Sequence, residues 1–175
     1  MGDSGNKALV TLDGTDMPVE MKFAKEFMSH KFKGNGLKYE VGVCIATGHI
    51  VWVHGPSRAG ESDITLARQA FVSFLNDDEM AVSDSGYRGE FRSIKTPDKV
   101  HFRSGLEFYN AAVARARHET VNARFKNNQV LVKRFRHSLA FHSACFRAVA
   151  VVSQLIIENG EPLFDVQYSD EGRKV

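Results

Sequence analysis

Two aspartates in this sequence stand where metal-assisted chemistry is often found. Asp13 and Asp84 each follow a short apolar run, ALVTLD at 8–13 and EMAVSD at 79–84. Such runs are typical of buried strands, and in open α/β sheets functional groups gather where strands end. If the two strands are parallel neighbours, about 5 Å apart, their carboxylates lie side by side.

Glu119 is a third carboxylate, and it stands alone in a basic part of the chain. The nearest other carboxylates along the sequence are Glu107 and Glu158. The cations between those two are Arg115, Arg117, Arg124, Lys126, Lys133, Arg134, Arg136 and Arg147. Two interpretations are open. Glu119 forms an ion pair with Arg115 one helical turn away, worth about 0.3 kcal/mol, or it joins the two strand-end aspartates in one site.

A cluster of three carboxylates has a chemical use. Anions this close repel each other and stay ionised only when a cation lies between them. Ligand sets made only of oxygen, with several carboxylates, suit Mg²⁺ or Mn²⁺ rather than zinc. Taken singly, each aspartate also fits a turn, because Asp13-Gly14 and Asp84-Ser85-Gly86 are favourable turn sequences.

The composition is that of an ordinary globular protein, with 43% hydrophobic and 25% charged residues. The chain of 175 residues is expected to form one domain, 1–175. Its net charge of +2 does not predict a nucleic-acid partner, but cations gather in 115–136 and acids at 77–79. A basic surface on a nearly neutral chain fits a polyanionic partner, and a solvated basic helix is the alternative.

The cysteines and histidines predict no zinc site. Cys44 and Cys145 form no CxxC pair, and His137, His142 and Cys145 lie close together without a common zinc spacing. No stretch approaches 18 consecutive apolar residues, and the N-terminus lacks a basic segment followed by an apolar one. We therefore expect a soluble, intracellular protein that does not contact a membrane.

The hydrophobic pattern predicts an α/β fold in which helices cover a mixed sheet. The expected strands are 8–13, a hairpin of 39–46 and 50–55, 79–84, and a short strand within 91–97. The expected helices are 61–75, capped by Ser62 or Asp63, then 104–126 and 139–157. A long polar loop is expected between the first strand and the hairpin.

Residue spacing also predicts which helix faces are buried. In 104–126 the face expected on the sheet comprises Tyr109, Ala112, Val113, Ala116, Thr120 and Ala123. A separate polar line comprises Arg115, Glu119, Asn122 and Lys126. In 139–157 the expected core face comprises Phe146, Val149, Ala150, Ser153, Ile156 and Ile157.

Several short motifs, taken in order, resemble the catalytic domain of DDE transposases, closest to the PIF-Harbinger group with its DDE superfamily endonuclease domain. They are VTLDGTDMPV, SHKFKGNGLKYEVGVCIATGHIVWVHGP, SDSGYRGEF and RARHETVNARFK, and the likeness spans about residues 8–165. The resemblance implies an RNase H-like, retroviral-integrase-like fold with a mixed sheet flanked by helices. It also places the acidic triad of the family at Asp13, Asp84 and Glu119, with 34 residues between the last two.

The resemblance implies a metal-dependent DNA endonuclease or transposase core that hydrolyses phosphodiester bonds and extends to strand transfer. Asp13, Asp84 and Glu119 would be the catalytic residues and the ligands of two Mg²⁺ or Mn²⁺ ions, which activate water or a 3′-hydroxyl. Two ions about 3.5–4 Å apart clamp the attacking and leaving oxygens of an in-line displacement. The alternative is a decayed or domesticated remnant that binds DNA or protein without catalysis.

DNA is the expected partner, contacted through its backbone without sequence preference. The candidate contacts are Lys31, Lys33, Arg115, Arg117, Arg124 and Arg134. Asp63 falls at a recurrent acid of the family, and we interpret it as a helix cap. Only twelve residues precede Asp13, where relatives carry a DNA-recognition region, so a separate recognition protein is expected. The nucleus is the expected compartment, and the sequence leaves the oligomeric state open.

Overall fold

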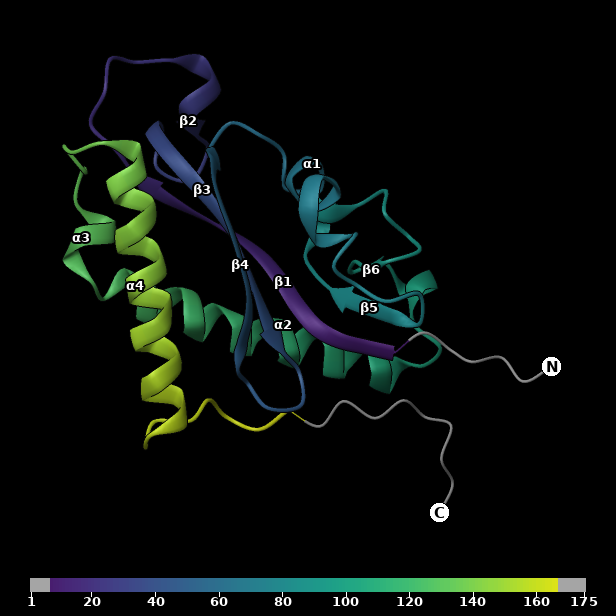
Figure 1. Cartoon of the computed structure of the whole chain (residues 1–175). Coiled ribbons are helices and arrows are strands. Elements are labelled where there is room, and N and C mark those ends of the chain that lie inside the picture. Colours follow the sequence, from purple (N-terminus) through teal and green to yellow (C-terminus); the bar gives the residue numbers. More distant parts are fainter. Residues whose placement is uncertain (1–6, 167–175) are drawn as a thin grey trace.

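The central strand β1 (Lys7–Pro18) organises the sheet, because it pairs with a different strand on each side. The computed structural model describes residues 7–166. In it β1 runs antiparallel to β3 (Gly34–Cys44) and parallel to β5 (Glu79–Val82). The outer strands are β4 (Ile50–Arg58) beside β3, β6 (Ile94–Lys95) beside β5, and the short β2 (Met28–Ser29) at one end of β3 (Figure 1). Within the described residues the sheet is therefore mixed and six-stranded.

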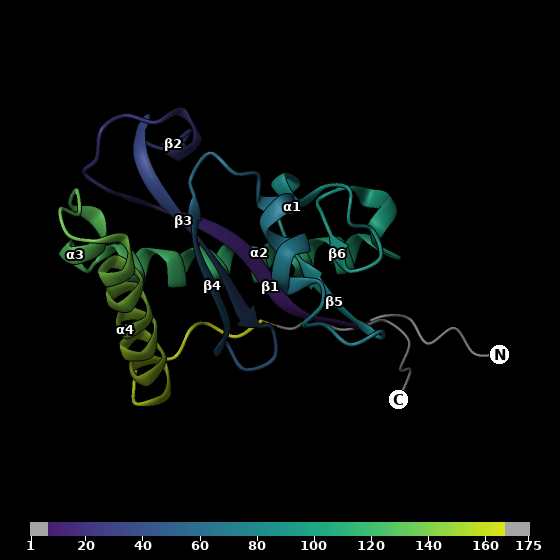
Figure 2. The same ribbon diagram turned by 45° about the horizontal axis from the view of Figure 1, so that its top comes forward.

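Helices pack on both faces of this sheet (Figure 1 and Figure 2). One face carries α1 (Asp63–Leu66), which continues into the π-helical turn η2 (Ala67–Phe71). The other face carries α2 (Gly105–Lys126), the short α3 (Gln129–Val132) and α4 (Leu139–Glu158). Short 3-10 turns are η1 (Lys25–Phe27), η3 (Ser85–Tyr87) and η4 (Lys99–His101).

Alternation along the strands sends side chains to separate apolar cores on the two faces. Val10 and Leu12 of β1 pack with Phe71 on the α1 side. On the opposite side, Tyr39 and two valines of β3 pack with residues of α2 and α4. Asp13 follows Leu12 directly, so its side chain lies on the α2 side of the sheet.

The strands confirm the predicted α/β order and correct the first strand. The strand predicted at 8–13 continues to Pro18, because its second half pairs with β3, from Asp13 opposite Val41 to Pro18 opposite Gly36. Asp13 therefore lies within a strand rather than at its end, and that part of the prediction is wrong. The parallel pairing of the first strand with 79–84 and the hairpin are confirmed. The predicted long loop contains η1 and β2.

The buried face of α2 differs from the predicted one. Tyr109, expected on the sheet, is 64% exposed. The buried residues of α2 are Glu107, Asn110, Ala111, Ala114, Arg117, His118, Val121, Asn122 and Phe125. Polar side chains are buried here because distant parts of the chain supply their partners, Thr11 for His118 and Asp13 for Asn122.

Helix α4 has the predicted core face, except that Ile156 is 40% exposed. By length and composition alone this helix would also be apolar enough to cross a membrane. Its Phe146 stacks on Tyr39 of β3, with ring centroids 3.8 Å apart, and meets Phe125 of α2 edge to face. One side of helix α4 therefore closes the core on this face of the sheet, while Val151, Val152 and Leu155 on its other side are exposed.

A buried ion pair fixes the start of α2 to the edge of the sheet. Lys95 Nζ of β6 donates to Glu107 Oε1 at 2.6 Å, and the two side chains are 9% and 4% exposed. Glu107 Oε2 accepts a bond from Arg103 N, and Glu107 N donates to Ser104 Oγ, which caps the helix. Because α2 begins here, the pair helps to set the position of Glu119 further along the helix.

Replacing Glu107 by Gln is expected to destabilise the fold by about 3–5 kcal/mol, because Lys95 would keep a buried charge without a counter-ion. Glu90→Gln is the matched control, since its ion pair with Arg68 lies nearer the surface and is worth at most about 1 kcal/mol. Urea unfolding followed by circular dichroism measures both variants. Similar, small changes in the two would show that the Lys95–Glu107 pair does not anchor α2.

Candidate functional site

Asp13 and Asp84 lie at the same level of two parallel strands. The last paired residues of β1 and β5 are Thr11 and Val82, and each aspartate is two residues further along its chain. Asp84 Oδ1 accepts a hydrogen bond from Gly86 N at 2.8 Å and so caps the turn η3. Since β5 ends at Val82 while β1 continues, Asp13 lies beside the open end of its neighbour.

Glu119 of α2 meets the two aspartates at a small cavity. The lining comprises Thr11, Leu12, Asp13, Asp84, Arg115, His118 and Glu119, and the volume is about 40 Å³. That space is enough for water molecules or metal ions and too small for an organic ligand. Asp84 and Glu119 are exposed and Asp13 is half-buried, so a group outside the protein can reach this cluster.

The buried position of Asp13 disfavours its negative charge, although Arg115 lines the cavity and Lys31 lies near. Burial is the main cause that raises the pKa of the Asp13 carboxyl to about 7; Glu119 and Asp84 raise it further, and Lys31 opposes them. A divalent cation would favour the ionised carboxylates here. As the side chains stand, no group of three or more His, Cys, Asp or Glu within residues 7–166 is arranged to hold a metal ion.

Two further polar side chains reach Asp13 or its neighbour. Lys31 Nζ donates to the carbonyl oxygen of Gly14 at 2.6 Å. Asn122 Nδ2 donates to Asp13 Oδ2 at 2.7 Å, and the residue is 3% exposed. In the sequence Asn122 belonged to a polar line without a role. Its place three residues after Glu119 on one helix was the available indication that it lies at the same site.

His118 holds α2 against β1. Its Nδ1 lies 2.9 Å from Thr11 Oγ1, and its Nε2 has no hydrogen-bond partner in the part of the chain that the structure describes. Complete burial lowers the pKa of the imidazole to about 3, so His118 is neutral at physiological pH. It therefore contributes shape and position to the cavity rather than charge.

The opposite face of β1 carries a second polar group, centred on Asp63. The predicted capping role is wrong for this residue, because Ser62 accepts the capping bond of α1 and Asp63 pairs with Lys38 at 2.7 Å. A Cβ atom at Gly14 or Gly86 would lie 2.7 Å from a carboxylate oxygen of Asp63. These glycines belong to the segments that carry the strand aspartates, so the Asp63 carboxylate fills the space between the two segments.

Glu40 of β3 is a second acid near Asp63, and it is fully buried. Trp52 Nε1 donates to its Oε2 at 3.1 Å. Burial is the main cause that raises the pKa of Glu40 to about 7; the nearby Asp63 adds to this, while Trp52 and Lys38 oppose it. The sheet thus holds carboxyl groups that resist ionisation on both of its faces.

The predicted DNA contacts do not share one environment. Arg117 is 2% exposed, and its Nη2 donates to the carbonyl oxygens of Cys44 and Ile45 at 2.8 and 2.6 Å. Its guanidinium holds the turn between β3 and β4, and we do not retain it as a DNA contact. Arg124 Nη1 donates to the carbonyl oxygen of Glu161. The remaining candidates are Lys31, Lys33 and Arg134, which are exposed, and Arg115, which lines the carboxylate cavity.

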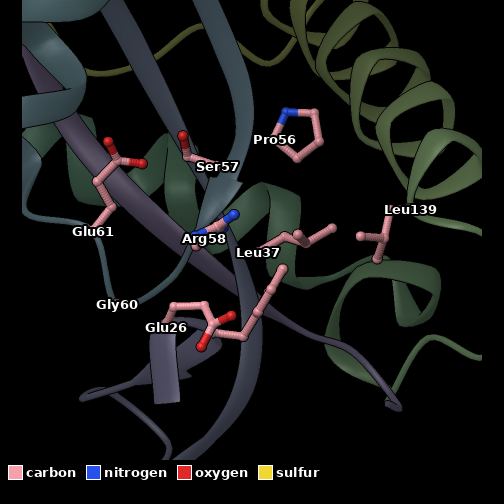
Figure 3. Close-up of a pocket in the computed structure, with 9 residues that line it drawn as sticks. Glu26, Leu37, Pro56, Ser57, Arg58, Gly60, Glu61 and Leu139 are labelled. Atoms are coloured by element: carbon pink, nitrogen blue, oxygen red, sulfur yellow. The ribbon is translucent and has the colours of Figure 1, made fainter. Parts of the chain in front are cut away.

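A larger cavity, of about 620 Å³, lies apart from the carboxylate cluster. Figure 3 shows it between Glu26 and Glu61 on one side and Leu139, at the start of α4, on the other. None of the three clustered carboxylates lines it, and Glu61 Oε1 already accepts a hydrogen bond from Gln69. The 620 Å³ cavity is the larger of the two, whereas the small one brings together carboxylates from three elements, and we take the small one as the candidate site.

Comparison with protein-family models matches residues 12–155 to the DDE superfamily endonuclease. The matched range begins one residue before Asp13 and ends within α4, so it includes all three clustered carboxylates. No curated protein matches the chain, and no solved structure does so. The family match confirms the resemblance seen in the sequence motifs.

We expect Glu40→Gln to change how stability depends on pH. The pKa of Glu40 is about 7 in the folded protein, against 4.5 for the free side chain. Between these values the folded protein keeps a proton that the unfolded chain has lost, so the wild-type free energy of unfolding falls as pH rises. Gln cannot ionise, so above pH 7 the variant should be the more stable, by on the order of 3 kcal/mol.

Urea unfolding of wild type and Glu40→Gln across this pH window measures the difference. Other titrating groups, such as Asp13 and His118, contribute alike to both proteins and cancel in the comparison. Parallel stability curves for the two proteins would show that Glu40 ionises normally in the folded state.

Proposed function

The chain belongs to the DDE superfamily endonucleases, and from this we propose that it is the catalytic core of a metal-dependent DNA nuclease or transposase. Its reactions would be hydrolysis of phosphodiester bonds and strand transfer, in which a 3′-hydroxyl replaces water as the attacking group. One observation carries the proposal: carboxylates from β1, the end of β5 and α2 line the same small cavity. Turns or caps at Asp13 and Asp84 and a surface ion pair at Glu119 would give no reason for the three to meet.

The donor chemistry of the cavity fits divalent metal. Three carboxylates form an oxygen ligand set of the kind that suits Mg²⁺ or Mn²⁺, and a bound cation would favour the ionised form of Asp13, whose pKa is raised to about 7 mainly by burial. Asp13, Asp84 and Glu119 would hold the metal, as two ions. When bound, such ions stabilise charge on the attacking and leaving oxygens of the phosphodiester.

Other side chains position these carboxylates and the DNA. Asn122 binds one oxygen of Asp13, which restricts rotation of that carboxylate. His118, through Thr11, keeps α2 at a fixed distance from β1. Lys31 is exposed and anchored to the backbone beside Asp13, where its ammonium group can meet a phosphate. These groups prepare the site without taking part in bond breaking.

We extend the proposal to the fold and to the DNA surface. A mixed sheet with helices on both faces supports the RNase H-like arrangement that the resemblance implies. The proposed DNA contacts are Lys31, Lys33, Arg115, Arg124 and Arg134. Contacts of cations with phosphates release counterions, so we expect binding that is independent of sequence and strongly weakened by salt.

A second candidate function is binding of DNA or protein without catalysis. It is favoured by one observation, that no group of three or more potential ligands within residues 7–166 is arranged to hold a metal ion as the side chains stand. In this case the three carboxylates would be inherited from an active enzyme of the same family, and this chain would have lost the activity. Metal binding and nicking separate the two candidates.

Mg²⁺ or Mn²⁺ should raise the melting temperature of the wild-type protein, because the ions bind only the folded state. At about 100 times the dissociation constant the expected increase is roughly 5–10 °C. Asp13→Asn and Asp84→Asn should lose most of it. Asp78→Asn, an exposed acid just before β5, is the matched control. Equal increases in wild type and both site variants would exclude the carboxylate cavity as the metal site.

Glu119→Gln should reduce metal-dependent nicking of supercoiled plasmid by at least about 100-fold. Its binding to DNA should hold or tighten, because the change removes a negative charge next to phosphate. Gel assays measure nicking and fluorescence anisotropy measures binding, with Asp78→Asn again as control. Nicking by this variant at the wild-type rate would show that Glu119 has no role in cleavage and would favour its interpretation as a member of a surface ion pair. A wild-type protein that binds DNA and does not nick it would favour the non-catalytic candidate.

A further inference from the structure

A third cavity, of about 290 Å³, lies at the far end of β1 from the N-terminus. Two aromatic rings that line it are unusually exposed for their type, Phe23 at 65% and Phe32 at 39%. Two exposed cations, Lys33 and Arg134, also line it. Exposed rings between cations form the kind of surface on which nucleic-acid bases stack while their phosphates are neutralised.

The ring of Phe32 and the backbone around Phe23 are held in place by their surroundings. The ring of Phe32 lies against β3, since a Cβ atom at Gly36 would be only 2.6 Å from Phe32 Cζ. The segment around Phe23 is tied down by Asn35, whose Nδ2 donates to the carbonyl oxygens of Met21 and Lys22, and whose Oδ1 accepts a bond from the next-but-one amide, Ala24 N. A ring that is already ordered loses little entropy when a ligand stacks on it.

The charge around this cavity suits a polyanion. The chain segments that line the cavity and the residues flanking them carry the cations Lys22, Lys25, Lys31, Lys33, Lys133, Arg134 and Arg136, against the acids Glu20 and Glu26. Arg136 pairs with Glu20 at 3.4 Å, while Lys33 and Arg134 form no ion pair among the described residues. An apolar peptide seated on the rings would leave these two cations without counter-ions, whereas a nucleic-acid strand brings phosphates with its bases.

The cavity lies further along β1 from the carboxylate site, and one short segment of the chain reaches both. Lys31 bonds to the carbonyl oxygen of Gly14, while the next two residues along the chain, Phe32 and Lys33, line the cavity. Pro18 also lines it, five residues beyond Asp13 on β1, which corresponds to about 16 Å along a strand. A DNA strand that contacts both the carboxylate site and this cavity would therefore need to span only a few nucleotides.

We propose that this cavity receives an unstacked base from a single-stranded segment of DNA that flanks the bond held at the carboxylates. Phe23 and Phe32 stack on the base, and Lys33 and Arg134 contact the phosphates on either side. The inference rests on the proposed function in taking DNA as the substrate, but it does not require that the chain cut DNA. It adds a preference for frayed or single-stranded ends over intact duplex.

The test measures binding of labelled single-stranded and duplex oligonucleotides of the same length by fluorescence anisotropy, in EDTA so that cleavage does not intervene. The variant Phe23→Leu/Phe32→Leu keeps apolar bulk and removes the rings, and Phe23→Ala alone leaves the ring packed on β3 untouched. Phe164→Ala is the matched control. Phe164 is 48% exposed and follows Leu163, which packs near Gly48 beyond the opposite end of β3.

The double variant should lose at least fivefold in affinity for single strand, since stacking on an aromatic side chain contributes roughly 5- to 150-fold per base. Its affinity for duplex should change less than that, and the salt dependence should stay the same, because no charge is removed. Lys33→Gln/Arg134→Gln should instead reduce the slope of log affinity against log salt by about one to two. Phe164→Ala should behave as wild type.

Several outcomes would overturn the inference. These are a single-strand loss of less than fivefold in the double variant, an equal loss for duplex, or the same loss in Phe164→Ala. A wild-type protein that binds duplex and not single strand would overturn it while leaving the proposed function standing. A wild-type protein that binds neither form of DNA would remove the proposed function and this inference together.

Discussion

Burial of a carboxylate on the central strand shapes much of this structure. Asp13 lies in β1 opposite Val41 of β3 and two residues beyond the last residue paired with β5, where burial works against its negative charge. Its neighbours reduce this effect only in part, because Lys31 and Asn122 favour the anion while Asp84 and Glu119 add charge of the same sign. Such a cluster is held together by the surrounding fold rather than by its own interactions, and it gains most from an added cation.

Polar contacts between α2 and the sheet help to hold the cluster, beside the apolar packing of Val121 and Phe125. Helix α2 is anchored at its start by the Lys95–Glu107 pair, then by His118 against β1, with Arg117 bonded to the turn after β3. Buried polar contacts have a defined direction, and leaving one unpaired is costly. They therefore limit sliding or rotation of α2 more strictly than apolar packing would, and Glu119 is presented at one position along β1.

The segment between β1 and β3 joins the two proposed DNA-binding places. Lys31 is bonded beside the carboxylates, and Phe32 and Lys33 continue directly into the aromatic cavity. Because Asn35 and the pairing of β2 with β3 order this segment, the two places keep their separation. This arrangement suits a DNA strand whose base stacks on the distant rings. The cations near the carboxylates would then bind its phosphates and place the phosphodiester bond at the proposed site.

Residue patterns were enough to identify the order of the elements and the family through its motifs, and they raised the parallel pairing of the strands of Asp13 and Asp84 as a condition that the structure meets. These features depend on neighbours in the chain or on apolar runs, which can be recognised without knowing the packing. The resemblance also grouped Glu119 with the two aspartates as the expected acidic triad, because the motif RARHETVNARFK around it is contiguous in the sequence.

The packed structure was needed for the roles of the polar residues of α2 and for Asp63. Small and polar residues occur on every side of α2, so periodicity chose the face with Tyr109, which is exposed. The partners that bury Arg117, His118 and Asn122 lie more than 70 residues away in sequence. Whether a polar side chain is buried depends on whether a distant group meets it with the right geometry, and that is a property of the assembled layers rather than of any local pattern.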